Sequence, residues 1–106
     1  MAVSTIAGNI LGAGVFTVSI TPVSVAANTS VEQSFTVPGV RVGDYVAVVS
    51  PSLAAGVGVE QARVTAANTV AITFQNSTAA GVVPAAGAYQ FLAVRPESGT
   101  FGSFAP

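Results

Sequence analysis

The stretch TAANTVAITFQN, from Thr65 to Asn76, decides the fold. After a short turn cluster, apolar residues alternate strictly with polar or small ones. A period of two is typical of a β-strand with one apolar face, here formed by Val70, Ile72 and Phe74. We expect this face to lie in the core and the opposite face, which carries Thr73, to lie on the solvent side of the sheet.

Five further segments also have extended patterns, and Gly, Pro and Asn clusters separate them. They are Val15–Ile20, Val31–Val37, Tyr45–Val49, Val59–Val64 and Ala88–Arg95. In the strand at 59–64 we expect Glu60, Ala62 and Val64 to share one face. The tetrapeptide AANT occurs at 26–29 and again at 66–69, each time before a strand, which indicates the same turn chemistry at both places.

Two of these segments, Tyr45–Val49 and Ala88–Arg95, are apolar on both faces. Strands of this kind occupy buried central positions or interfaces. We therefore place both segments nearer to a subunit contact than the stretch from Thr65 to Asn76.

The composition of the chain also favours contacts with other subunits. Only 7% of the 106 residues are charged and 51% are hydrophobic, whereas ordinary domains contain roughly 25% charged residues. The length fits one domain. Either the surface is unusually rich in small residues, or other subunits cover much of it; we favour the second interpretation.

Charge argues against a nucleic-acid partner, because three scattered arginines cannot follow a phosphate backbone. These are Arg41, Arg63 and Arg95, which we expect to pair with Glu60 or Asp44. The N-terminal apolar run is interrupted by polar residues and glycines, lacks a basic start, and is too short to span a membrane. We expect no membrane partner and an unprocessed protein.

Catalytic chemistry has little basis in this sequence. There is no His and no Cys, which removes imidazole bases, thiol nucleophiles and the common zinc ligands. The four carboxylates, Glu32, Asp44, Glu60 and Glu97, fall in separate segments. We predict that the chain is not an enzyme and holds no cofactor or metal.

Three phrases carry a family resemblance: VPGVRVGDYVAVVSP at 37–51, ARVTAANTVAITFQN at 62–76 and PAAGAYQFLAVR at 84–95. They resemble small virion proteins of tailed bacteriophages, and the likeness extends from Ile20 to Arg95. In phages such β-domains occur as capsid decoration (cement) proteins and as fibre modules. The resemblance implies a structural protein without catalytic residues, forming a homotrimer or homodimer on the head.

We therefore expect an all-β fold: a single antiparallel β-sandwich, jelly-roll-like, with about six to eight strands over residues 15–96. An N-terminal arm (1–14) and a C-terminal tail (97–106) flank it. The tail carries two phenylalanines, which indicates that it docks on its own domain or on a partner.

The predicted function is a capsid decoration protein that binds the major capsid protein of the assembled head, located on the virion and soluble in the host cytoplasm before assembly. The alternative is a tail or head fibre module that binds a host-surface glycan or protein. The predicted capsid or subunit contacts are Val3, Ile6, Ile10, Leu11, Tyr45, Arg95, Phe101 and Phe104.

Overall fold

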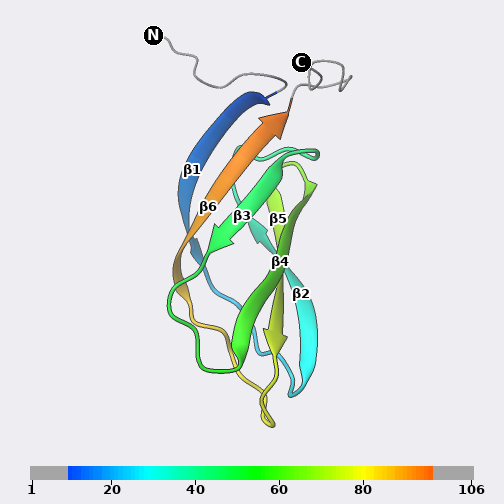
Figure 1. Cartoon of the computed structure of the whole chain (residues 1–106), viewed down its shortest axis with the longest axis vertical. Helices are drawn as coiled ribbons and strands as arrows, with labels where there is room; N and C mark the ends of the chain where they lie inside the picture. The colour runs from blue at the N-terminus through cyan, green and yellow to red at the C-terminus, as the bar shows by residue number, and fades with distance from the viewer. Residues whose placement is uncertain (1–9, 97–106) are drawn as a thin grey trace.

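The computed structural model describes residues 10–96, which form six β-strands (Figure 1). The strands are β1 (Ile10–Ile20), β2 (Thr29–Thr36), β3 (Tyr45–Val49), β4 (Val57–Ala66), β5 (Thr69–Asn76) and β6 (Gly87–Pro96). They form two antiparallel three-stranded sheets, with strand orders β1-β6-β3 and β2-β5-β4. Residues 10–96 contain no helix, so the all-β prediction is confirmed.

The two sheets share one hydrophobic core. The central strands β5 and β6 contribute Val70, Ile72, Phe74, Tyr89 and Phe91, all fully buried. The ring of Phe74 packs edge-to-face against Phe35 on one side and Tyr89 on the other, with ring centroids 6.4 Å apart in both pairs. This is a geometry that aromatic pairs prefer. The predicted core face of the stretch from Thr65 to Asn76 is confirmed.

The prediction that Thr73 faces solvent is wrong. Strand β5 lies between β2 and β4, and Thr73 is only 7% exposed. Glu32 of β2 lies opposite Thr73, Arg63 of β4 lies opposite Ala71, and their side chains form an ion pair at 2.8 Å. Because this pair reaches across β5, the long side chains of the flanking strands cover the small residues of the central one.

The expected faces of the strand at 59–64 are wrong at its start, where Val59 also faces the core, whereas Ala62 and Val64 share one face as expected. The register between β4 and β5 shifts between Val59 and Gln61. A bulge of this kind inserts one residue into one strand and reverses the alternation beyond it. As a result Val59 lies opposite Phe74 and Ala62 opposite Ile72, and both pack against the core.

Strand β1 begins at Ile10, five residues before the start expected at Val15. Residues 10–14, which we expected in the N-terminal arm, pair instead with the end of β6, where Ile10 lies opposite Pro96 and Gly14 opposite Ala93. The first and last described residues therefore lie at the same end of the molecule (Figure 1). Most of the predicted arm (1–9) and the tail (97–106) fall outside the described residues.

The two AANT segments form turns, as predicted. Asn28 and Asn68 have φ angles of 54° and 60°, in the left-handed region that Asn tolerates better than most residues. Asn68 also ties its turn to a neighbouring loop, because its Oδ1 accepts a hydrogen bond from the Gly39 backbone N–H at 2.8 Å.

Candidate interaction surface

The outer face of the β1-β6-β3 sheet carries mainly small and apolar side chains. Cross-strand register defines its rows: Ala13, Val94 and Tyr45; then Val15, Leu92 and Ala47; then Thr17, Gln90 and Val49. We call the seven apolar members of these rows the apolar face: Ala13, Val15, Tyr45, Ala47, Val49, Leu92 and Val94.

The apolar face is open to solvent. Val15 is 67% exposed, Tyr45 62%, Val49 63% and Leu92 45%. Alternation along each strand explains why: their neighbours Phe16, Val48 and Phe91 point inward and are already part of the core or packed against it. A sheet with one face in the core usually carries polar residues on the other. Large apolar residues gathered on that outer side therefore indicate a binding surface.

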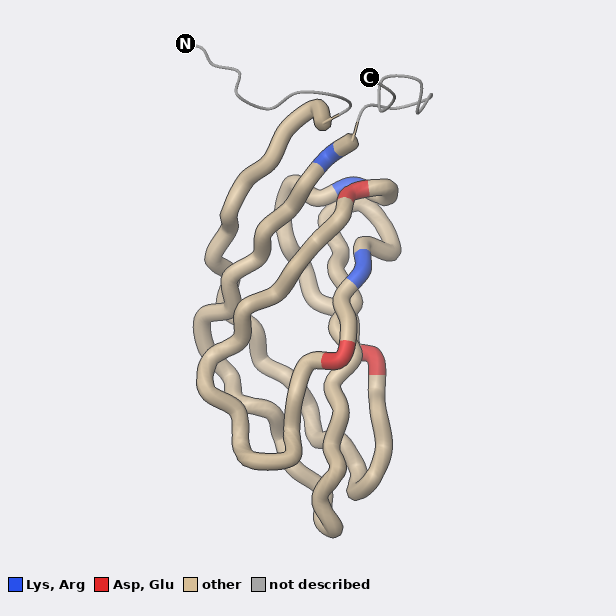
Figure 2. Tube along the Cα trace, in the orientation of Figure 1, with Lys and Arg blue, Asp and Glu red and all other residues tan. Residues whose placement is uncertain are grey.

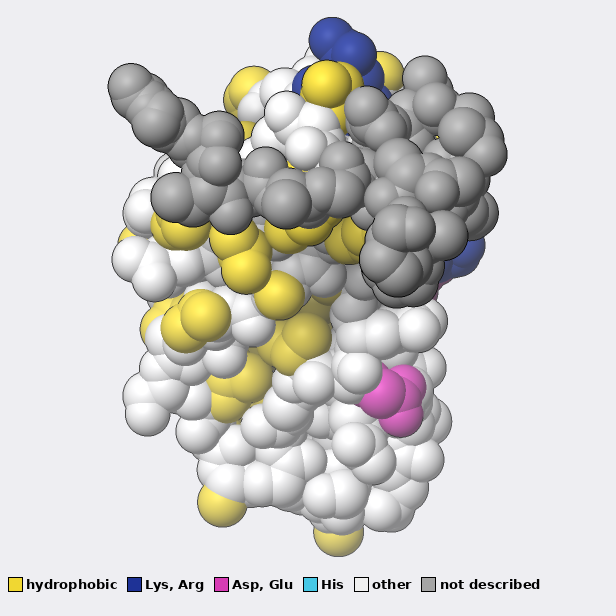
Figure 3. Space-filling view, turned by 45° about the horizontal axis from the view of Figure 1, so that its top comes forward, with side chains coloured by type: hydrophobic (Ala, Val, Ile, Leu, Met, Phe, Trp, Pro, Cys, Tyr) yellow, Lys and Arg dark blue, Asp and Glu magenta, His cyan; other side chains and the backbone are white. Residues whose placement is uncertain are grey.

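Charge is nearly absent from this sheet. Arg95 is the only charged residue in β1, β3 and β6, and it lies near the end of β6 (Figure 2). The space-filling view shows hydrophobic side chains gathered in a band, with charged side chains at the margins (Figure 3). Charge depletion at the centre and polar groups at the rim are typical of protein–protein interfaces.

The outer face of the β2-β5-β4 sheet differs in kind. The Arg63 guanidinium donates to both oxygens of the Glu32 carboxylate, at 2.8 and 2.9 Å. This bond lowers the pKa of Glu32 below its ordinary value. The two residues are exposed enough that the pair adds little stability, but it keeps this face charged and hydrated. The two outer faces therefore differ in charge and in the size of their exposed apolar side chains.

Arg95 does not belong to the apolar face. Its guanidinium donates to both oxygens of Asp44, at 2.9 and 2.8 Å, and to the Gly39 carbonyl at 2.9 Å. Asp44 also accepts from the Arg41 backbone N–H at 3.0 Å. The bond from Arg95 is the main cause that lowers the pKa of Asp44, opposed in part by burial. Arg95 therefore makes contacts within its own domain, which link the loop before β3 to the end of β6.

Of the other predicted contact residues, Tyr45 is a member of the apolar face. Ile10 and Leu11 are exposed at the start of β1, beyond the last row of the face. Val3, Ile6, Phe101 and Phe104 lie outside the described residues.

Sequence reasoning missed three of the large exposed members of the apolar face: Val15, Val49 and Leu92. The signal for Val49 and Leu92 was present, because their segments are apolar on both faces. Val15 carried no such signal, since the strand was expected to begin there.

The described part of the chain has few side chains that could bind a metal or titrate. Among residues 10–96, no three His, Cys, Asp or Glu side chains come together as a metal site. Tyr89 is buried, which raises its pKa, and its hydroxyl donates to the Ala85 carbonyl at 2.7 Å. Over the same residues, no helix has the length and apolar character needed to cross a membrane.

Comparison of the chain with protein-family models, with curated proteins and with solved structures found no match.

Proposed function

We propose that the chain is a non-catalytic structural protein of a virus particle, and specifically a capsid decoration protein of a tailed bacteriophage. The observation that carries the proposal is the apolar face, an exposed and uncharged surface on a chain with very little charge. The sequence resemblance supplies the phage context. The proposed partner of the apolar face is the major capsid protein of the assembled head.

The strand connectivity supports the β-sandwich of jelly-roll type that we propose as the full description of the fold. The first strand pairs with the last, β2 pairs with β5, and β3 contacts β4. β3 and β4 lie in different sheets, so this third couple is a contact between the sheets and not a hydrogen-bonded ladder. Jelly rolls are common in capsid proteins and in lectins, so this support is by analogy.

The size of the apolar face bears on how it would bind. Three strands about 4.8 Å apart and five residues at about 3.4 Å give roughly 250 Å² of projected area. Stable complexes bury about 800 Å² on each partner. A single face of this size binds weakly, so the proposal needs linked copies or added contacts from elsewhere in the chain. The proposed homotrimer or homodimer would supply linked copies, whose avidity multiplies a weak contact.

The proposed mechanism is mass action. A protein that binds only the assembled shell lowers the free energy of that state and of no other. The shell then resists rupture without any chemical step.

Binding to purified heads of the phage whose particles carry this protein tests the proposal. Leu92→Glu places a charge at the centre of the apolar face, and we expect the bound fraction in co-sedimentation to fall about tenfold or more. Ser30→Glu, on the exposed outer side of β2, is the matched control and should bind like the natural chain. Equal binding by both variants would refute the apolar face as the shell contact.

One observation favours a second function, a fibre module that binds a host-surface glycan. Tyr45 is a largely exposed aromatic side chain, and an aromatic ring offers an apolar surface with a polar tip. A glycan array separates the two functions: Tyr45-dependent binding to a defined glycan supports the fibre module and argues against the decoration protein.

A further inference from the structure

Strand β1 is an outer strand of the β1-β6-β3 sheet (Figure 1). One of its edges pairs with β6, and within residues 10–96 no strand pairs with the other edge. In an antiparallel ladder the backbone N–H and C=O groups of alternate residues point to opposite sides of a strand. About half of these groups in β1 therefore point away from β6, and such an edge is a template for pairing with another strand.

The other three outer strands carry features that discourage this pairing. Strand β3 has only five residues. The ladder of β4 has two register shifts, and the strand includes Glu60 and Arg63. Strand β2 carries Glu32. Short length, bulges and charge are the devices by which natural proteins protect sheet edges. Strand β1 has 11 residues with no charge and no proline, and its register with β6 is regular from Gly12 onward.

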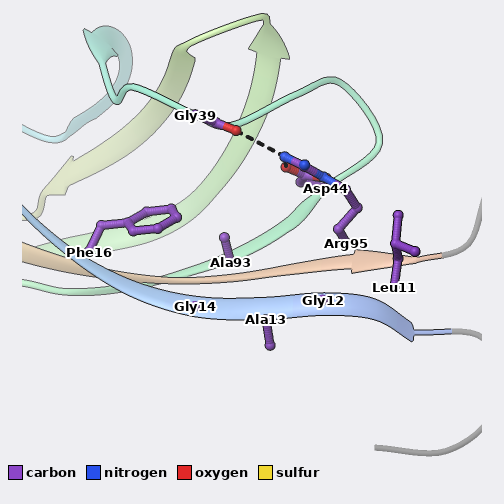
Figure 4. Close-up of a pocket in the computed structure, with 9 residues that line it drawn as sticks. All are labelled: Leu11, Gly12, Ala13, Gly14, Phe16, Gly39, Asp44, Ala93 and Arg95. Carbon is purple, nitrogen blue, oxygen red and sulfur yellow. Dashed lines mark hydrogen bonds and ion pairs between the residues drawn. The ribbon is translucent and has the colours of Figure 1, made fainter.

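Both sides of β1 present surface that an added strand would cover. On the outer side Val15 is 67% exposed, and Thr17 is also exposed. On the inner side Phe16 is only partly buried, whereas Phe91, which lies opposite on the central strand β6, is fully buried. Figure 4 shows the side chains of Phe16 and Ala13 on opposite sides of the β1 ribbon. A strand added at this edge would bury apolar atoms on both sides of the sheet.

We propose that the outer edge of β1 pairs with the same edge of a second copy of the chain, antiparallel, about a two-fold axis at Phe16. This register uses the whole regular part of the strand, because it sets Gly12 of each copy opposite Ile20 of the other. Val15 then lies opposite Thr17 on the outer side. The two Phe16 rings meet on the inner side, and cross-strand aromatic pairs stabilise sheets.

A second copy fits this edge because β1 is complementary to itself. Two-fold contacts use the same surface on both subunits, so a strand that carries a charge would bring like charges together. In β1 there is no charge to oppose another. The pairing also closes at two copies, since the outer edges of the joined sheet are then both β3, the short strand.

The dimer would place the two apolar faces side by side. A two-fold axis perpendicular to a sheet keeps each outer face on its own side, so the faces form one surface of roughly 500 Å² projected area, twice that of a single copy. The dimer therefore provides the linked copies that the proposed shell contact requires. The pairing itself rests on the edge of β1 and does not depend on the shell as partner.

Sedimentation equilibrium of the free chain tests the pairing. The contact is only about 30 Å long and buries less than the usual 800 Å² or so per partner, so we expect a dimer with a dissociation constant in the micromolar range. Thr17→Lys adds a charge at the edge and should raise that constant about tenfold or more, and Ser19→Lys should act likewise. Gln90→Lys is the matched control, because Gln90 is exposed in the same row as Thr17 but lies on the central strand.

A chain that is monomeric at about 100 μM, well above a micromolar dissociation constant, would refute the proposal, and so would a trimer. A monomer is also the result expected if residues 1–9 or 97–106 of the same chain occupied the edge. An effect of Gln90→Lys as large as that of Thr17→Lys would indicate that the apolar faces stack on each other, which refutes the edge contact. Loss of shell binding by a chain that still dimerises would refute the proposed function alone.

Disulfide formation tests the register. The chain has no Cys, so introduced thiols are unique. An oxidised mixture of Val15→Cys and Thr17→Cys should form the mixed disulfide, because the two positions lie opposite each other. Val15→Cys alone should give about tenfold less, since its two copies lie on a diagonal about 7–8 Å apart, at the limit for a disulfide. Equal yields from the mixture and from Val15→Cys alone would refute the pairing.

Discussion

At the scale of single residues, a few polar side chains hold the loops on an apolar framework. Asn76 is fully buried, and its Nδ2 donates to the carbonyls of Val25 and Ala80 at 3.0 and 2.9 Å. Asp44 is nearly as enclosed and is held by Arg95. Buried polar groups are costly unless their hydrogen bonds are made, so each of these residues fixes one arrangement of its loop.

The Asp44–Arg95 pair predicts how stability depends on pH. The pair lowers the folded-state pKa of Asp44 below its unfolded value of about 3.9. Its stabilising effect is therefore fully present above about pH 5 and is lost as the pH falls through 4 toward the folded-state pKa. Asp44→Asn should lower the Tm at pH 7 by about 5–10 °C and should reduce the loss of Tm between pH 5 and pH 3.

The control for that prediction is Glu60→Gln, because Glu60 takes part in neither of the ion pairs found within residues 10–96. This variant should retain the acid sensitivity of the natural chain. Identical pH profiles for Asp44→Asn and the natural chain would contradict the role given to the pair.

At the scale of elements, the two AANT turns offer a matched comparison. Both Asn28 and Asn68 have positive φ, a conformation that Gly adopts without strain. Only Asn68 uses its side chain to accept from the Gly39 N–H. We expect Asn28→Gly to change the free energy of unfolding by less than about 0.5 kcal/mol and Asn68→Gly to lower it by about 1 kcal/mol. Urea titration measures both, and equal effects would show that the hydrogen bond adds nothing.

Strand existence and core faces were predictable from the sequence because alternation is a local signal. The alternation of Val70, Ile72 and Phe74 sufficed to assign them to the core. The burial of Thr73 was not predictable in this way, since it depends on Glu32 and Arg63 meeting across β5. The bulge between Val59 and Gln61 is likewise set by pairing with a neighbour.

The candidate surface was predicted in part for a related reason. The segments Tyr45–Val49 and Ala88–Arg95 are apolar on both faces, and that local signal indicated a contact. The order of the strands in the sheet could not be predicted from the sequence. Because β6 lies between β1 and β3, Val15 lies in one row with Leu92 and Ala47.

At the scale of the whole molecule, one sheet presents an apolar outer face and the other a charged one. Leu92→Glu should leave the folded domain intact, because Leu92 is 45% exposed and surface substitutions change stability by about 0.5 kcal/mol. The same variant should bind less of a hydrophobic dye and should stay soluble at higher concentration. A large loss of Tm would show that Leu92 supports the fold rather than a contact.

The central claim is that the apolar face contacts the shell of a phage head. A cryo-electron microscopy reconstruction of particles that carry the protein tests it most directly. The account predicts copies in icosahedral positions on the head, with Val15, Tyr45 and Leu92 buried against the shell. Copies found only on the tail, or head-bound copies whose apolar face is open to solvent, would contradict it.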